Sequence, residues 1–296
     1  MEWFVFAFIA MMLFPLCNVI SKFILTNKTK DVLSYNLMTY IFDVFTIILL
    51  ASFLNLKFDF SVVLSVLYGF IFVFIWILYF KAIKEEEVSR VAMTRSSAPI
   101  FVLILSYVFL KETLDFNKYL GIILLVSSAF LASYKKSGNK FHISTALATI
   151  ILFVFGTACM SVLTKYTLNF TDYWNFFFWS IVGGQIGCLL LLMLPSIRKN
   201  FVREAIKIGK KTWLAILASY IISLVGWISY YVAVSMGKIS IVYALMSTRP
   251  MILFIYTLIL TFFMPHILKE DVNRTSLLMK SLAGILIIIG SYLIVT

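Results

Sequence analysis

The chain has 296 residues, of which 62% are hydrophobic and only 13% are charged. An ordinary globular domain has roughly 45–50% apolar and about 25% charged residues, so this composition excludes a soluble fold. The formal net charge of +12 comes from basic residues scattered through short connections, which favours anionic lipid headgroups over nucleic acid as the partner. Because helices satisfy their own backbone hydrogen bonds in lipid, we predict an all-α polytopic membrane protein.

Apolar runs separated by charged or Asn/Gly/Pro-containing turns predict ten transmembrane helices. They cover residues 3–25, 33–54, 62–83, 88–110, 119–134, 143–163, 174–194, 213–234, 239–263 and 277–295. The first run lacks the basic region of a signal peptide, so we expect it to be a span. The basic, amphipathic stretch 195–211 predicts an additional helix on the membrane surface.

The distribution of lysine and arginine predicts the orientation of the spans. Most of these residues lie in the connections after spans 1, 3, 5, 7 and 9, and the opposite side has only Lys57, Lys111, Lys118, Lys165 and Lys238. Since positive residues accumulate in the cytoplasm, we expect the odd connections there and both termini outside. We expect a multi-pass protein of a bacterial inner (cytoplasmic) membrane.

Cysteine and histidine give no sign of a metal site, a disulfide framework or a cofactor. Cys17, Cys159 and Cys188 lie in apolar segments without CxxC spacing, and His142 and His266 flank spans without a second ligand. No P-loop is present, so we expect no direct use of ATP. An intramembrane enzyme needs a nucleophile with its base, a metal set or paired carboxylates, and the deep residues include no such set. We therefore predict a protein that is not an enzyme.

Two segments of the chain are similar at an offset of 151 residues. Residues 76–99 read WILYFKAIKEEEVSRVAMTRSSAP and residues 227–250 read WISYYVAVSMGKISIVYALMSTRP. Eight positions are identical, pairing Trp76 with Trp227, Ile77 with Ile228, Tyr79 with Tyr230, Ala82 with Ala233, Ser89 with Ser240, Val91 with Val242, Ser96 with Ser247 and Pro99 with Pro250. Shared apolar composition does not align Trp, Tyr and Pro together, so we interpret the two halves as copies.

The repeat predicts a first copy over residues 1–140 and a second over residues 141–296, with five spans each. Because five is odd, the second copy enters the membrane inverted relative to the first. Many transporters are built from such inverted repeats, with the substrate near the bilayer midplane and access that alternates between the two sides. The sequence therefore predicts a carrier.

With these features the chain resembles the drug/metabolite transporter superfamily, in its ten-helix, EamA-like branch. The resemblance rests on the two five-helix repeats, the small residues before Pro99 and Pro250, and an acidic residue that follows in LKETL (residues 110–114) and LKEDV (residues 268–272). A helix with a glycine closes each repeat, at Gly121 and Gly284. LKE stands where a Gly-Glu pair is more typical of the family.

The resemblance implies a secondary-active or facilitative carrier of a small polar metabolite, with the membrane lipids as its surroundings. A carboxylate-bearing solute such as an amino acid is our first hypothesis. The alternatives are a cationic amine, a phosphorylated or nucleotide-linked metabolite, and a lipid-linked headgroup moved by a flippase. The sequence does not determine which ion is coupled to transport, or whether the protein is a monomer or a homodimer.

Pro99 and Pro250 lie inside predicted spans 4 and 9. Each removes the amide that would bond the carbonyl four residues earlier, which belongs to Arg95 or Met246. The freed carbonyls can bond a ligand, or each proline can mark a simple kink in which Ser96 or a neighbouring serine takes up the freed bond.

Arg95 and Arg249 lie roughly 10 and 15 Å inside their predicted spans, at 1.5 Å per residue. An ionisable group at such depth costs at least about 2.5 kcal/mol, so it normally faces a wet cavity or a partner. Asp43 is the one acidic residue deep in a predicted span, and it serves either as the salt-bridge partner of one arginine or as an ion-coupling site. The second arginine then favours an anionic group on the substrate, unless both arginines only hold helices together.

Further candidates for the cavity wall are Asn18 in span 1 and two aromatic pairs, Trp76 with Tyr79 and Trp227 with Tyr230. The aromatic pairs recur in both copies, although such residues also pack between helices or mark the membrane interface. Lys22 and Lys165, near helix ends, favour snorkelling to headgroups. Gly183 and Gly187 have the GxxxG spacing of closely packed helices, and Gln185 can bond across that contact.

Overall fold

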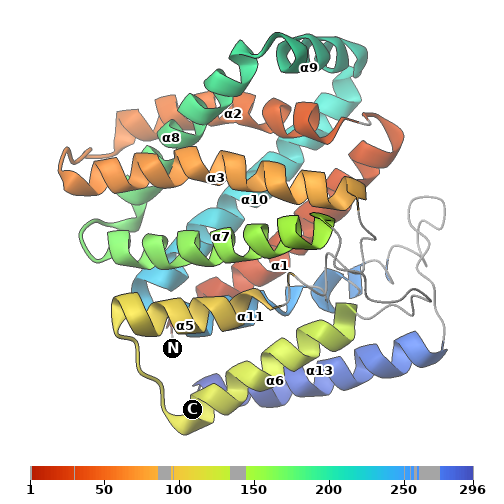
Figure 1. Cartoon of the computed structure of the whole chain (residues 1–296). Coiled ribbons are helices and arrows are strands. Elements are labelled where there is room, and N and C mark those ends of the chain that lie inside the picture. Colours follow the sequence, from red (N-terminus) through yellow and green to blue (C-terminus); the bar gives the residue numbers. More distant parts are fainter. Residues whose placement is uncertain are drawn as a thin grey trace.

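The computed structural model describes residues 2–29, 31–85, 95, 97–133, 145–249, 251–253, 255–256, 259 and 274–295. Within these residues the chain is helical, with turns and short connections and no strand. Figure 1 shows the helices, which are α1 (Glu2–Asn27), α2 (Val32–Phe53), α3 (Phe60–Glu85), α5 (Ala98–Leu110), α6 (Phe116–Ser133), α7 (Thr145–Leu168), α8 (Tyr173–Met193), α9 (Pro195–Lys207), α10 (Lys210–Met236), α11 (Ile239–Met246) and α13 (Arg274–Val295).

Six helical segments of the described chain are long and apolar enough to cross a membrane. They are Glu2–Leu25, Val32–Phe53, Phe60–Leu78, Ala148–Leu168, Tyr173–Met193 and Lys210–Met236. Shorter apolar helices cover Ala98–Leu110, Phe116–Ser128, Ile239–Leu253 and Ser281–Ile294. The predicted all-α polytopic class is therefore confirmed, and each of the ten predicted spans overlaps one of these ten segments.

Spans 4 and 9 are not continuous helices in the structure, contrary to the prediction. Helix α5 begins at Ala98 after a turn at Ser97, with Pro99 in its first turn, where a missing amide leaves no bond unmade. Helix α11 ends at Met246 and a turn follows before Arg249. The prolines that suggested a kink in the sequence thus lie close to a break in each helix. Ser96 and Pro250 lie outside the described residues.

Helices α3 and α8 pack with their backbones in close contact at glycines. A Cβ atom on Gly69 would lie 1.8 Å from the carbonyl oxygen of Ser180, and one on Gly183 would lie 2.0 Å from that of Val66. The close packing predicted from GxxxG is confirmed. Gln185 extends the contact to a third helix, because its Nε2 donates to the carbonyl oxygen of Tyr40 on α2 at 2.6 Å.

The last helices of the two halves, α6 and α13, also meet at glycines. A Cβ atom on Gly121 would lie 2.9 Å from the carbonyl oxygen of Gly290. The sequence identified Gly284 as the counterpart of Gly121, but the close backbone contact is made by Gly290, about two turns later in α13. Figure 1 shows this pair side by side below the other helices.

Helix α7 continues to Leu168, five residues beyond the predicted end of span 6. The prediction ended the span before Lys165 because a lysine there suggested the headgroup region. In the structure the Nζ atom of Lys165 instead donates to the carbonyl oxygens of Val234 and Ser235 at 2.8 and 3.2 Å. These carbonyls belong to the last turn of α10, so Lys165 caps a neighbouring helix instead of snorkelling.

The predicted additional helix in 195–211 is present as α9, which begins with Pro195 after the end of α8. Its inner face packs on α2 and α8 through Ile197 and Phe201. The carboxyl group of Glu204 is buried and accepts a hydrogen bond from the Thr29 hydroxyl at 2.9 Å. This helix therefore connects the two halves of the chain on the side that the lysine and arginine distribution assigns to the cytoplasm.

Candidate functional site

Arg249 lies directly after the break in span 9 and is oriented toward α1. Its guanidinium carbon lies 4.3 Å from the centroid of the Phe14 ring, within the range of a cation–π contact. Its Nε atom is buried and has no hydrogen-bond partner among the described residues. A buried donor without an acceptor costs the full desolvation penalty of the group, so this nitrogen is suited to a ligand atom.

Arg95 lies on the other side of the matching break, three residues before α5 begins. Its guanidinium carbon lies 5.9 Å from the ring centroids of both Trp76 on α3 and Phe153 on α7. The charges of Arg95 and Arg249 repel each other. The structure thus brings both predicted arginines to the interior of the bundle, each against aromatic rings.

A continuous aromatic wall joins the surroundings of the two arginines. Trp227 on α10 lies edge-on to Phe14 at a centroid distance of 5.0 Å and edge-on to Phe72 on α3 at 5.6 Å. Phe72 in turn contacts Trp76 at 6.0 Å. The wall therefore runs from Arg249 through four rings to Arg95, and it includes Trp76 and Trp227, which the repeat pairs.

Tyrosines extend this wall into the core. Tyr231 stacks on Trp227 at a centroid distance of 5.6 Å, and its hydroxyl oxygen lies 3.4 Å from that of Tyr68. The predicted candidate Tyr230 is also buried and lies beside both Trp227 and Tyr231. The sequence identified Tyr230 but missed Tyr231, which is not identical between the two copies, and Tyr68, which lies outside the repeated segment. The side chain of its counterpart Tyr79 lies outside the described part of the structure.

Asn18 lies one helical turn after Phe14 on α1, and its side chain is exposed. Residues four apart share a helix face, so this amide lies near the Arg249 end of the aromatic wall. The side chain of Lys22, another turn further on, is outside the described residues.

The described contact of Asp43 is with a tyrosine and not with an arginine. The hydroxyl of Tyr220 on α10 donates to Asp43 Oδ1 at 2.6 Å, and it also lies 2.7 Å from Thr46 Oγ1. Ion pairs among the described residues join Lys57 to Asp172, Lys118 to Asp115 and Arg203 to Glu204. The two roles suggested for Asp43, a salt bridge with an arginine or ion coupling, stay predictions.

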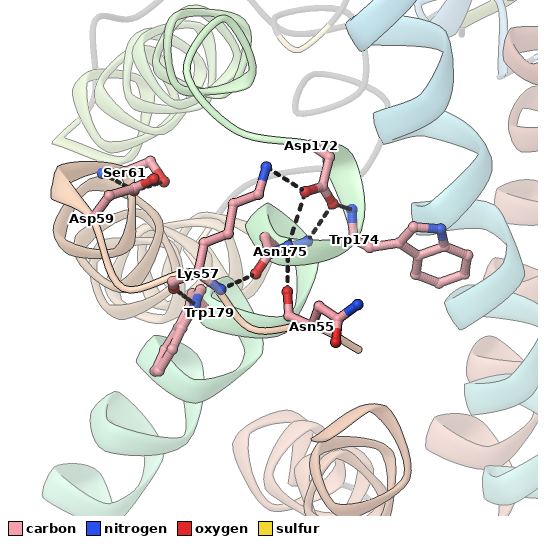
Figure 2. Close-up of polar contacts among 8 residues, drawn as sticks. All are labelled: Asn55, Lys57, Asp59, Ser61, Asp172, Trp174, Asn175 and Trp179. Atoms are coloured by element: carbon pink, nitrogen blue, oxygen red, sulfur yellow. Dashed lines mark hydrogen bonds and ion pairs between the residues drawn. The ribbon is translucent and has the colours of Figure 1, made fainter. Parts of the chain in front are cut away.

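The connection between α2 and α3 is bonded to the start of α8, as Figure 2 shows. Asn175 accepts from the backbone amide of Lys57 at 2.9 Å, and the Lys57 ammonium lies 3.4 Å from Asp172. Trp179 donates from its ring nitrogen to the carbonyl oxygen of Lys57 at 3.2 Å. We call these residues, with Asn55, the Asn175 network; it joins the first half of the chain to the second.

Asp172 also caps helix α8, because its carboxylate accepts from the amides of Trp174 and Asn175 at 3.1 and 3.0 Å. Burial alone would raise the pKa of Asp172, but the hydrogen bonds from Asn175 and the nearby Lys57 outweigh it, so the pKa lies below its ordinary value. An acidic residue directly before an apolar run is a known helix-start signal. Asp172, directly before the apolar run that starts at Tyr173, matches that signal.

Replacing Asp172 with alanine is expected to destabilise the protein by about 0.5–2 kcal/mol, the usual cost of a lost helix cap. Because the pKa is lower in the folded state, this contribution is complete above the ordinary carboxyl pKa of about 4 and is lost as the pH falls below it. Thermal unfolding of wild type and variant should therefore differ at pH 7 and converge at low pH.

Two variants control this experiment. Asp172→Asn keeps a capping side chain, so it should retain most of the stability at pH 7 while losing the acid dependence. Asp115→Ala removes an exposed carboxylate and should change little. Equal unfolding temperatures for Asp172→Ala and Asp115→Ala would refute the assigned role.

A second set of bonds connects the halves at the α10–α11 turn. The Glu112 carboxylate accepts from the amide of Ile239 at 3.0 Å and from the hydroxyl of Ser240 at 2.8 Å, and Lys238 donates to the carbonyl oxygen of Thr113. We call these residues the Glu112 network. Glu112 is the acidic residue of the LKETL motif, and the structure shows that it caps the first turn of α11.

The chain has similarity to known transporters. The model of the EamA-like transporter family matches residues 1–134. Residues 1–134 are therefore similar to the EamA-like transporter family. This match agrees with the resemblance found in the sequence, and the apolar helices indicate a multi-pass membrane protein.

Curated relatives match this chain over part of its length. It is 30% identical over 138 residues to an uncharacterized transporter of Archaeoglobus fulgidus, covering 46% of each protein. It is 23% identical over 160 residues to Protein LicB of Haemophilus influenzae, covering 54% of this chain and 53% of that protein. The matched part of the chain thus spans about half the length of these curated relatives.

A solved crystal structure has the same fold as this chain. It covers 98% of this chain and 94% of its own, with a TM-score of 0.70 and 15% sequence identity. At this identity the likeness establishes the fold alone.

Proposed function

We propose that the protein is a secondary carrier that moves a small carboxylate-bearing solute by alternating access. The observation that carries the proposal is the buried Nε of Arg249, which has no partner among the described residues and lies beside an aromatic ring. A guanidinium group binds a carboxylate through two parallel hydrogen bonds. The aromatic wall supplies apolar surface for the rest of the solute.

Reciprocal helix pairings support a carrier built from two inverted five-helix repeats, residues 1–140 and 141–296. Helix α1 packs on α10 and α7 packs on α3, while α2 packs on both α8 and α10 and α8 packs on both α2 and α3. The counterparts in the two halves are α1 and α7, α2 and α8, and α3 and α10. When each helix is replaced by its counterpart, the α1–α10 pair becomes the α7–α3 pair and the α2–α10 pair becomes the α8–α3 pair. The breaks near Ser97 and Thr248 are also 151 residues apart. Broken helices at equivalent positions are typical of substrate sites in inverted repeats.

The two inter-half networks supply a basis for alternating access. The Asn175 network and the Glu112 network both connect residues 1–140 to residues 141–296, and both lie in connections that follow even-numbered spans. We propose that these bonds hold the carrier closed on that side and break when the halves rock apart. Part-buried and exposed hydrogen bonds, together with the exposed ion pair of Lys57 and Asp172, suit such a role, because each one is weak enough to be exchanged for water.

The aromatic wall supports a second candidate, a cationic amine. Stacked and edge-on tryptophan and tyrosine rings bind ammonium groups through cation–π contacts. In this site, however, two guanidinium groups already lie against the rings, and their positive charge opposes a second cation. We therefore favour the carboxylate.

We propose that the protein functions in a bacterial inner membrane, surrounded by lipids, without nucleic-acid partners and without a catalytic activity of its own. The positive residues of the odd connections support a cytoplasmic location for that side. We propose a monomer or a homodimer. A second copy of the chain is not needed to form the site, because every residue of the aromatic wall comes from one chain.

A thermal-shift screen of the purified protein tests the substrate class. Small carboxylates (L-glutamate, L-alanine, succinate), amines (putrescine, ethanolamine), sugar phosphates and nucleotides are compared at matched concentrations. A solute that binds only the native state raises the unfolding temperature. We expect stabilisation by at least one carboxylate and none by the simple amines. Stabilisation by amines alone would favour the second candidate.

A further inference from the structure

The membrane-spanning part of the chain holds a second polar cluster, separate from the aromatic wall. Asp43 lies near the middle of the 22-residue helix α2 and is half-buried. The Tyr220 hydroxyl donates to its Oδ1 at 2.6 Å and lies 2.7 Å from Thr46 Oγ1. A carboxyl group, a phenol and an alcohol thus form one hydrogen-bonded chain between α2 and α10.

The groups that face this cluster carry no positive charge within the described residues. Helix α2 itself contributes Tyr40 and Thr46, α8 contributes Cys188 and Gln185, and α10 contributes Tyr220. Tyr68 on α3 interacts with Tyr40 of α2, and α9 packs on α2 with Ile197 and Phe201. An ionised Asp43 is therefore stabilised by a hydroxyl group and not by a cation.

A carboxylate in a bilayer with no lysine or arginine partner is costly, so intramembrane acidic residues commonly bind an ion or a proton. A metal ion would need several oxygen ligands that converge on it. The hydroxyl groups of Tyr220 and Thr46 are already engaged with the carboxylate and with each other. A proton needs only the carboxylate oxygen, and the hydroxyl chain can bond to either protonation state by reversing its donors.

We propose that Asp43 is a proton-binding site that couples this carrier to a proton gradient, with one proton moving in the same direction as the solute. Asp43 takes a proton from water on one side of the membrane and releases it to water on the other. The inference rests on the proposed function, since it deepens the mechanism of the same carrier.

Charge balance determines the direction of coupling. With the solute bound, the negative carboxylate pairs with Arg249 and a protonated Asp43 is neutral. Without solute, Arg249 keeps its charge and an ionised Asp43 supplies the balancing negative charge inside the bundle. For a solute with a net charge of −1, such as L-glutamate, both forms of the carrier then have the same net charge, so neither half of the cycle has an extra uncompensated charge in lipid. Solute and proton must move together for this balance to hold.

Infrared difference spectroscopy of the protein in liposomes tests the proton site without any solute. We expect a protonated-carboxyl band that appears as the pH is lowered in wild type and is missing from Asp43→Asn. Tyr220→Phe should move the midpoint of this band to higher pH, because it removes the hydrogen bond to the ionised form. Asp115→Asn, which alters an exposed carboxylate, should leave the band unchanged. A titration identical in wild type and Asp43→Asn overturns the proposal.

Uptake into proteoliposomes tests the coupling, with labelled L-glutamate, L-alanine and succinate as separate probes. An acidic exterior should stimulate wild-type uptake, and Asp43→Asn should lose this stimulation while it still exchanges internal for external solute. Stimulation that survives in Asp43→Asn, or wild-type uptake that ignores the pH gradient, overturns the coupling. If wild type moves none of the probes while the infrared band titrates with Asp43, the proposed substrate class fails and the proton site stands.

Discussion

Replacing Arg249 with alanine is expected to lower the affinity for the transported carboxylate by about 10- to 100-fold. A hydrogen bond to a charged group contributes about 1.5–3 kcal/mol, and each 1.4 kcal/mol corresponds to a factor of ten in binding. The effect is large because the guanidinium Nε is buried and no described residue competes with the ligand for it. Titration calorimetry with the carboxylate that shifts the unfolding temperature most measures this loss.

Two variants control the Arg249 experiment. Arg249→Lys keeps the charge but not the fork of parallel donors, so its affinity should fall between wild type and alanine. Arg203→Ala removes an exposed arginine of α9 that lies outside the site and should bind as wild type does. Membrane insertion should be unchanged in all three. An Arg249→Ala protein with wild-type affinity would show that the ligand contacts other groups.

Replacing Gly69 with alanine is expected to destabilise the protein strongly. The new Cβ atom would lie 1.8 Å from the Ser180 carbonyl oxygen, which belongs to a helix backbone and cannot rotate away. Overpacking typically costs about 1–3 kcal/mol, and the helix propensity that alanine gains returns at most about 1 kcal/mol. Thermal unfolding in detergent should show a clear drop, and the yield of folded protein should fall with it.

Gly209→Ala is the matched control for this substitution. A Cβ atom at Gly209 meets nothing within 4 Å, so the variant should unfold close to the wild-type temperature. Gly183→Ala provides an independent test of the same α3–α8 contact from its other side, because its Cβ would lie 2.0 Å from the Val66 carbonyl oxygen. If Gly69→Ala were as stable as Gly209→Ala, the two helices would have to be further apart than the structure places them.

Much of the fold was predictable because a bilayer imposes a simple pattern on sequence. Each span needs an uninterrupted apolar run, and deep polar residues such as Arg95 and Arg249 stand out against it. The alignment of Trp76 with Trp227 at an offset of 151 residues also identified part of the aromatic wall before any coordinates were used. These signals are local or repeated, which is why a single sequence contains them.

Other features depend on contacts between residues far apart in the chain, which leave no local pattern. Tyr220 lies 177 positions from Asp43, and nothing in either segment predicts their hydrogen bond. The same holds for Gly69, which looks like an ordinary helix residue until α8 is placed beside it. The break in span 9 was predicted as no more than a kink, because a proline in an apolar run has the same signature in both cases.

The central claim is that Arg249 binds the carboxylate of a transported solute. The most direct test is to measure the uptake of labelled solutes into proteoliposomes that contain either the wild-type protein or Arg249→Ala. We predict saturable uptake of at least one carboxylate by the wild-type protein. Excess unlabelled carboxylate should block this uptake and putrescine should not affect it. In Arg249→Ala the uptake should be at least about 10-fold weaker. Saturable uptake of an amine alone, at the same rate in both proteins, would contradict the claim.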